Sequence, residues 1–326
     1  MSLFRPLWGV LPPSWRRVSL AERRVFASLL RVQLDAGLDL SVALRSFAQR
    51  GSPGLESVGR IMAQRIDEGS TVAQAADAVP ELFTPYERIL MDIGERSGSL
   101  VEVLRAIEEA AGWLAELRRK TLGALVYPAI LVNVAYLCGN VMMLMDGAIA
   151  AYLLGWVLLD VVLAAASIGL GWALEREPLR VALDRLLLNT PGLSRLLGTP
   201  LTHYHQALFF AALGRSLEVG VDLPVALGLA VCSVECEPIR RDLAPIVEGL
   251  QRGEPLGASA LKCRFLTPAQ QTTIDVAESA GGLPSALMVL ARDAREELER
   301  WLSIYQRVLP VVLLLLMTVY VLARGM

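Results

Sequence analysis

Long uncharged stretches alternate with amphipathic ones along this chain. Residues 122–145 carry no charged side chain, residues 148–174 carry only Asp160, and residues 308–323 form a third apolar run. A helix rises about 1.5 Å per residue, so about 20 apolar residues cross a hydrocarbon core of about 30 Å. The pattern predicts three transmembrane helices over these ranges. The alternative for each run is a buried helix of a large soluble core.

The segments between the apolar runs have the spacing of amphipathic helices. Apolar residues recur three and four positions apart around Phe26 and again around Phe209, and no stretch alternates with period two for long. We therefore expect an all-α protein without a sheet. Its predicted parts are a short leader (1–22), a first helical bundle (23–121), a connector (175–204) and a second bundle (205–307).

The two predicted bundles are copies of one another. Residues 35–44 read DAGLDLSVAL and residues 218–227 read EVGVDLPVAL, an offset of 183. At the same offset, DIGERSGSL (92–100) matches DVAESAGGL (275–283). Matched patches at one fixed spacing indicate an internal duplication.

Each copy contains the same helix-ending and helix-starting residues. Gly37 and Gly220 suit a left-handed position after a helix, and Asp39 and Asp222 are placed to cap the helix that follows. The repeat motif is completed by Leu40 and Leu223, which are identical in the two copies.

A second pair of signals precedes the long helix of each copy. Thr84 and Thr267 each stand before a proline, which predicts a helix N-cap followed by proline at the first helical position. Gly98 and Gly281 then predict a break before helices that run into the first and third apolar stretches.

The distribution of basic residues predicts the orientation. Residues 1–121 contain 16 Lys and Arg and residues 175–307 contain 14, whereas the segment between the first two apolar runs contains none. Basic residues stay on the cytoplasmic side. Both bundles and the N-terminus are therefore expected in the cytoplasm, and the C-terminus on the far side of the membrane.

Composition argues against most enzymatic and nucleic-acid functions. The net charge is −2, the chain has only two histidines, and no phosphate-binding loop or catalytic signature is present. Zinc bound by Cys232, Cys236, His203 and His205 is an alternative, but buried thiols and surface histidines explain these residues as well. We expect no cofactor, no metal and no catalytic site.

The duplicated motifs resemble the GspF/PilC family, the inner-membrane platform proteins of bacterial type II secretion systems and type IV pili. The resemblance covers roughly residues 23–323, although the leader is short and Ala277 and Ala280 replace a glycine and a serine in the second copy. It implies partners rather than substrates: a cytoplasmic assembly ATPase, pilins or pseudopilins, other inner-membrane assembly proteins and a second copy of the chain. No nucleic-acid partner is expected.

Five residues are candidates for partner or assembly contacts. Glu95 and Glu278, with Gly98 and Gly281 beside them, occupy matched positions. Each glutamate is interpreted as a partner contact, as a first-turn residue of the long helix, or as a residue paired inside its own bundle. Asp160 is costly at a bilayer centre, so it is expected either to couple to pilin or a second protomer, or to bond with Asn133, Tyr136 or Asn140. An alternative function is a small transporter or channel component that uses Asp160.

Overall fold

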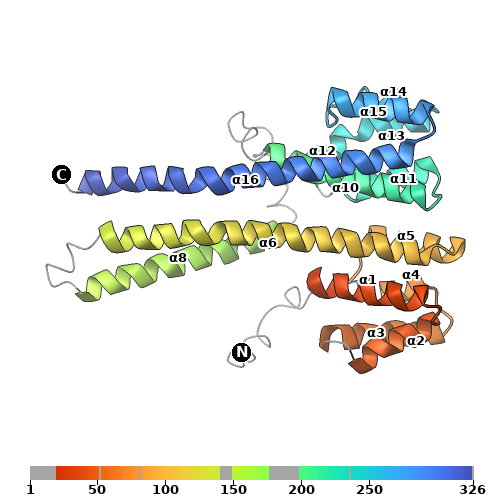
Figure 1. The fold of residues 1–326 in the computed structure, drawn as a ribbon, viewed down its shortest axis with the longest axis horizontal. Helices are drawn as coiled ribbons and strands as arrows, with labels where there is room; N and C mark the ends of the chain where they lie inside the picture. Colours follow the sequence, from red (N-terminus) through yellow and green to blue (C-terminus); the bar gives the residue numbers. More distant parts are fainter. Residues whose placement is uncertain are drawn as a thin grey trace. The chain divides into compact units, whose positions relative to one another are not determined.

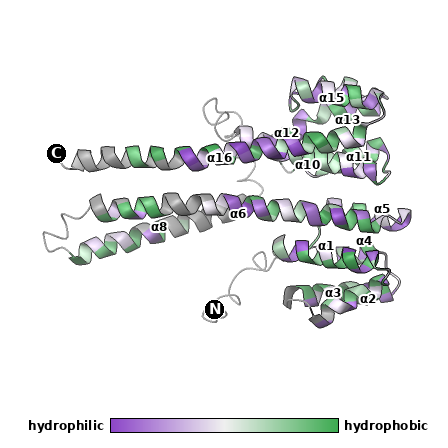
Figure 2. Cartoon of the chain, in the orientation of Figure 1, coloured by the Kyte–Doolittle hydropathy of each residue, from purple (hydrophilic) through white to green (hydrophobic). Residues whose placement is uncertain are grey.

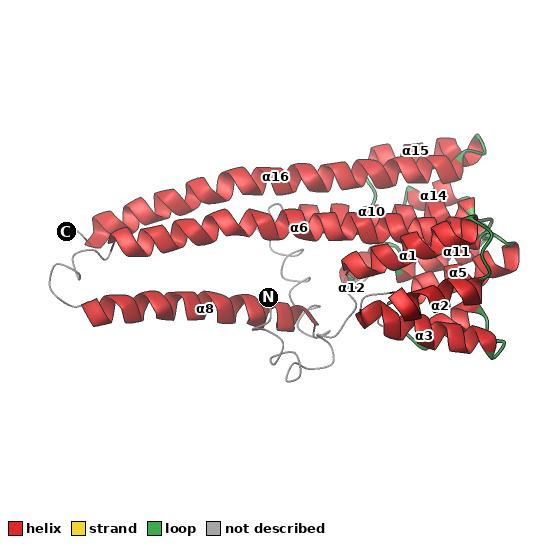
Figure 3. Ribbon diagram, turned by 60° about the horizontal axis from the view of Figure 1, so that its bottom comes forward, coloured by secondary structure: helices red, strands yellow, loops and turns green. Residues whose placement is uncertain are grey.

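The structure, a computed structural model, describes residues 20–50, 53–80, 82–139, 149–175, 198–234 and 236–324. Every regular element within these ranges is a helix, and none of the described residues forms a strand (Figure 3). The expected all-α class is therefore confirmed. Residues 1–19 of the predicted leader and most of the connector lie outside the described residues.

The first copy folds as five helices that lead into a long sixth (Figure 1). Aromatic side chains hold it together: the Phe26 ring lies 4.7 Å from the Phe47 ring and 5.9 Å from the Phe83 ring, centre to centre. All three are buried. The helices are α1 (Leu20–Asp35), α2 (Leu40–Arg50), α3 (Pro53–Asp67), α4 (Val72–Asp77), α5 (Pro85–Ser97) and α6 (Leu100–Gly139).

The second copy repeats these elements. Helix starts at residues 40, 85 and 100 recur at 223, 268 and 283, which is the offset of 183 found in the sequence. Where the first copy has α3, the second has two short helices, because Pro245 offers no N–H to continue the first of them. The helices are α10 (Thr199–Glu218), α11 (Leu223–Cys232), α12 (Glu237–Asp242), α13 (Ala244–Gln251), α14 (Leu256–Ala260), α15 (Pro268–Ser279) and α16 (Leu283–Arg324).

The chain forms two compact units whose limits differ from those of the two copies. One unit contains residues 1–118 and 212–232, and the other contains residues 119–211 and 233–326. The end of α10 and all of α11, which belong to the second copy, thus cluster with the first copy. The predicted bundle boundaries at 23–121 and 205–307 stay a prediction.

The first turn of each copy has the expected backbone but not the same cap. Gly37 and Gly220 have φ of 81° and 85°. Asp39 Oδ2 accepts hydrogen bonds from the N–H (3.1 Å) and the hydroxyl of Ser41 (2.8 Å), which lowers the pKa of this carboxyl. The expectation for Asp222 was wrong: its carboxylate makes no such bond in the described structure, because Pro224 occupies the equivalent position and has no N–H.

The turns before the long helices agree with the predictions. Thr84 and Thr267 are N-caps with complete capping boxes, each followed by proline. Gly98 and Gly281 have φ of 73° and 75°, in the left-handed region. Both copies therefore use the same local signals to start their last helices.

Three helices contain the predicted membrane segments: α6, α16 and α8 (Ile149–Glu175). Figure 2 shows few hydrophilic residues along α8, whereas α6 and α16 each have a hydrophilic portion. Among the described residues, none of the helices combines the length and the apolar character that crossing a membrane requires. Residues 140–145 of the first predicted span lie outside the description.

Candidate functional site

The two matched glutamates bind the start of the same helix in each copy. Glu95 Oε2 accepts a hydrogen bond of 2.8 Å from the backbone N–H of Val72, the first residue of α4. Glu278 Oε1 and Oε2 accept from Leu256 N–H (2.8 Å) and Gly257 N–H (2.7 Å), the first two residues of α14. A carboxylate here satisfies N–H groups that have no partner within their helix and is favoured by the helix dipole.

This geometry decides between the structural interpretations of the glutamates. Both residues lie at the end of α5 or α15, so the expectation of a first-turn residue in the long helix was wrong. The expectation of pairing inside the same bundle is confirmed. Sequence reasoning missed the bonded N–H groups because these lie 21 to 23 residues upstream.

The two capped helices depend on their glutamate to different degrees. In α4, the N-cap residue Thr71 also accepts from Gln74 N–H (3.3 Å), and the Gln74 side chain accepts from Thr71 N–H (3.1 Å). In α14 the N-cap residue is Pro255, which supplies no side-chain hydrogen bond. Glu278 is therefore the more important of the two caps.

Close helix packing explains a glycine of the first copy and its replacement in the second. A Cβ added to Gly94 would lie 2.7 Å from Val103 Cγ2, so α5 and α6 leave no space for it. At the matched positions, the second copy has Ala277 and Ala286. The larger residue at one position is offset by the smaller one at the other, because an interior tolerates exchanges that conserve volume.

A seam joins the second copy to the first within one compact unit. The buried guanidinium of Arg215 on α10 donates to the carbonyl of Ala106 (2.7 Å) and to Glu109 Oε2 (2.7 Å), both on α6. The hydroxyl of Tyr86 on α5 donates to the carbonyl of Ala212 (3.2 Å), also on α10. We call this contact of α10 with α5 and α6 the internal seam.

Burial in the internal seam changes the acidity of the Tyr86 hydroxyl. Burial raises the pKa of Tyr86 to about 12, although the nearby Ser216 hydroxyl acts in the opposite direction. Leu229 of α11 belongs to the hydrophobic core of the first copy. Arg215, a cation within the apolar stretch FFAALGRSL, was the only sequence signal for this seam.

Asp160 takes part in a polar contact between α6 and α8. Its Oδ1 accepts a hydrogen bond of 3.1 Å from Asn133 Nδ2, and Asn133 Oδ1 accepts one of 2.6 Å from Trp156 Nε1. The expected bond with Asn133 is confirmed. Asn140 lies outside the described residues.

Metal-ligating side chains do not converge in the part of the chain that the structure describes. No group of three or more His, Cys, Asp or Glu residues there is placed to hold an ion. Cys236 is buried at the start of α12, and Cys232 is exposed. The contacts found among the described residues are helix caps, a seam and interhelical polar contacts.

This protein belongs to the class of duplicated all-helical proteins. It contains two copies of one helical module, and these copies end in helices of 40 and 42 residues. A comparison with protein families matches residues 26–146 and 209–323, which fall in the two copies, to the family described as type II secretion system protein F. The chain belongs to this family.

Two curated relatives support the same assignment over a shorter length. A type II secretion system protein F from Aeromonas hydrophila is 30% identical over 121 residues, which is 37% of this chain and 31% of that protein. The protein of the same description from Vibrio cholerae serotype O1 is 25% identical over 118 residues, 36% of this chain and 29% of that protein. Each match spans less than a third of the relative's own length.

Proposed function

We propose that this protein is an inner-membrane platform of a bacterial type II secretion machine or of a related type IV pilus. In this role it couples a cytoplasmic assembly ATPase to the extraction and polymerisation of pilins or pseudopilins. The observation that carries the proposal is the family match over both copies of the module. Other inner-membrane assembly proteins and a second copy of the chain are the remaining proposed partners.

The proposal places residues 122–145, 148–174 and 308–323 in the bilayer, with both bundles in the cytoplasm. Exposed apolar side chains on α8 and α16 support this placement, because a surface of this kind needs an apolar environment. Leu154 is 71% exposed and Leu315 is 61% exposed. The basic residues that flank the runs favour the cytoplasmic side for the bundles.

A mechanical role agrees with the contacts of the described residues. The internal seam connects helices that are far apart in the sequence, and the caps at α4 and α14 tie each of these two short helices to the one that follows it. Connections of this kind transmit displacement between elements, since packed helices move as units rather than deform continuously. Glu95 is the proposed partner residue because it is exposed as well as bonded to α4.

Deleting the gene in its own host tests the platform function. We expect export of folded proteins to the medium, or pilus production, to be lost and then restored by the full-length chain. Unchanged secretion and unchanged piliation in the deletion strain would contradict the proposal.

The same complementation separates the two roles of Glu95. Glu95→Lys should reduce output under both interpretations, because an ammonium group cannot accept the Val72 N–H. Glu95→Gln keeps an acceptor oxygen and removes the charge. A partner role predicts loss of output from Glu95→Gln with normal thermal stability, whereas a purely structural role predicts output close to wild type.

A further inference from the structure

The internal seam occupies one face of α10 and one face of α5 and α6. Duplication gives each of these faces a counterpart 183 residues away: α1 corresponds to α10, and α15 and α16 correspond to α5 and α6. The chain therefore contains two more faces of the same type. The exposure, size and polarity of their side chains indicate what they bind.

The seam-equivalent face of α1 is apolar and open, and it continues into the turn after the helix. Its side chains are about half exposed, whereas their counterparts on α10 and in the turn that follows it are buried in the described structure. The open residues are Leu29 (46% exposed), Val32 (50%) and Leu38 (45%), and their counterparts are Ala212 (4%), Arg215 (7%) and Val221 (8%).

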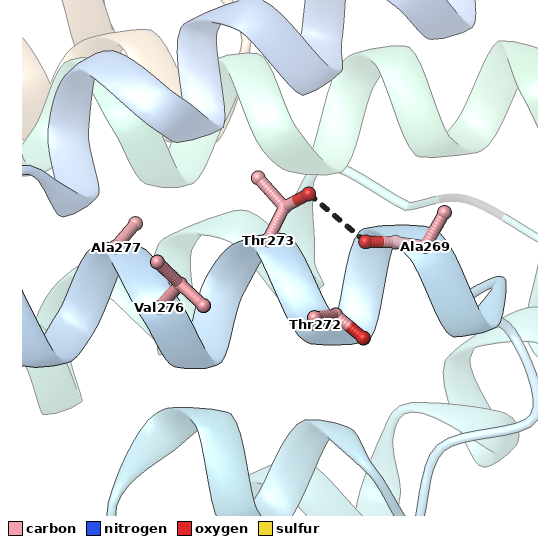
Figure 4. Close-up of a pocket in the computed structure, with 5 residues that line it drawn as sticks. All are labelled: Ala269, Thr272, Thr273, Val276 and Ala277. Atoms are coloured by element: carbon pink, nitrogen blue, oxygen red, sulfur yellow. Dashed lines mark hydrogen bonds between the residues drawn. The ribbon is translucent and has the colours of Figure 1, made fainter.

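The seam-equivalent face of α15 and α16 is open as well. Val276 is 58% exposed and Val289 is 47% exposed. An open hollow of about 540 Å³ runs along α15. Figure 4 shows the side chains that line it, which are Ala269, Thr272, Thr273, Val276 and Ala277.

The sizes of the residues on the two open faces are complementary. In the internal seam a large residue of α5, Tyr86, lies against a small one of α10, Ala212. At the matched positions the sizes are exchanged: Ala269 leaves space on α15, and Leu29 supplies bulk on α1. Exchanges that conserve the summed volume preserve close packing.

The matched residues on the two open faces are both apolar, whereas the internal seam pairs a charged side chain with a backbone carbonyl. The internal seam uses Arg215, which donates to the carbonyl of Ala106. Their counterparts are Val32 and Val289, two apolar side chains that need no hydrogen-bond partner. Both halves of a second seam are thus present. Their central residues are apolar, whereas the counterpart of Glu109 is Arg292, whose side chain is exposed.

We propose that α1 of one molecule packs against α15 and α16 of a second copy of the chain, in a contact that repeats the internal seam. This inference deepens the proposed platform function, on which it rests, by assigning the surface through which copies assemble. The contact joins two different faces, and a two-fold axis forms it twice with the roles of the two copies exchanged. Two copies that each offer both faces can close as a dimer.

A matched control residue is available on α2. Val42 is 49% exposed, like Val32, but its counterpart Val225 is also exposed, at 52%. The Val42 position therefore lies outside the seam in the copy where the seam is formed. An arginine at this position tests the effect of the substitution without touching the proposed contact.

The first experiment uses the full-length chain, co-expressed in membranes with two different affinity tags. We expect Val32→Arg and Val289→Arg, each introduced into both tagged chains, to lower co-purification roughly tenfold or more, because each buries an unpaired charge in an apolar contact. Val42→Arg should leave it unchanged. Resistance to limited proteolysis, compared across the three variants, identifies any loss that comes from misfolding.

The second experiment places Val32→Cys in one tagged chain and Val289→Cys in the other, in a background where Cys232 is serine. A short thiol cross-linker should join the two tags, and the pair Val42→Cys with Val289→Cys should not. Two results would overturn the proposal. One is that Val289→Arg leaves co-purification unchanged. The other is that a chain carrying both Val32→Cys and Val289→Cys forms cross-links only within itself. Secretion is not part of either readout, so the platform function can fail independently.

Discussion

Gly257→Ala is expected to destabilise the protein by about 2 kcal/mol or more, because overpacking a well-packed interior costs about 1–3 kcal/mol. A Cβ at this position would lie 2.4 Å from Asp275 Oδ1 and 2.6 Å from Asp275 Cα. The carboxylate oxygen can rotate away, but the Cα is backbone of α15. Helices α14 and α15 must therefore separate to accept one methyl group.

Thermal unfolding of the purified full-length chain in detergent measures this effect. The matched control is Gly228→Ala in α11, where an added Cβ meets nothing within 4 Å. This control should be neutral or stabilise the protein by about 0.5–1 kcal/mol, since alanine is the better helix former. If the two variants melt at the same temperature, α14 and α15 do not approach as closely as described.

Glu278→Ala is expected to lower the free energy of unfolding by about 2 kcal/mol, which is the usual value of hydrogen bonds to a charged group. The substitution leaves the N–H groups of Leu256 and Gly257 without their acceptor. Pro255 cannot replace it, because it supplies no side-chain hydrogen bond to α14.

Glu95→Ala is the repeat-matched control for this variant. The loss there should be about 1 kcal/mol or less, since one hydrogen bond is removed and the capping box of Thr71 remains. Chemical denaturation of both variants under the same conditions compares the two losses. Equal losses would mean that the α14 N-terminus does not depend on Glu278.

Local signals were sufficient to predict the secondary structure and the duplication. Thr84 before Pro85, and Gly98 before α6, each determine the backbone within a few residues of themselves. Interactions of this kind depend on residues adjacent in the chain, so a single sequence contains them in full. The same is true of Asp39, whose capping role follows from its own turn.

The prediction for Asp222 failed because it did not take into account the proline two residues further along the chain. The motif predicted a cap, but Pro224 removed the N–H that an aspartate would bind. This failure was in principle readable from the sequence. The contacts of Glu95 and Glu278 were not, because the N–H groups that they bind belong to helices formed some 20 residues earlier.

The sequence by itself determined an all-helical, duplicated chain with matched turns and matched glutamates, since helix periodicity, capping and repetition are properties of neighbouring or equally spaced residues. Only the tertiary structure decided that Glu278 caps α14 and that Arg215 bonds to α6. It also decided that Leu29 and Val32 stay open while their counterparts are buried. The physical reason is that burial and long-range hydrogen bonds depend on which helix faces meet, and helix spacing alone does not specify the partner of a face.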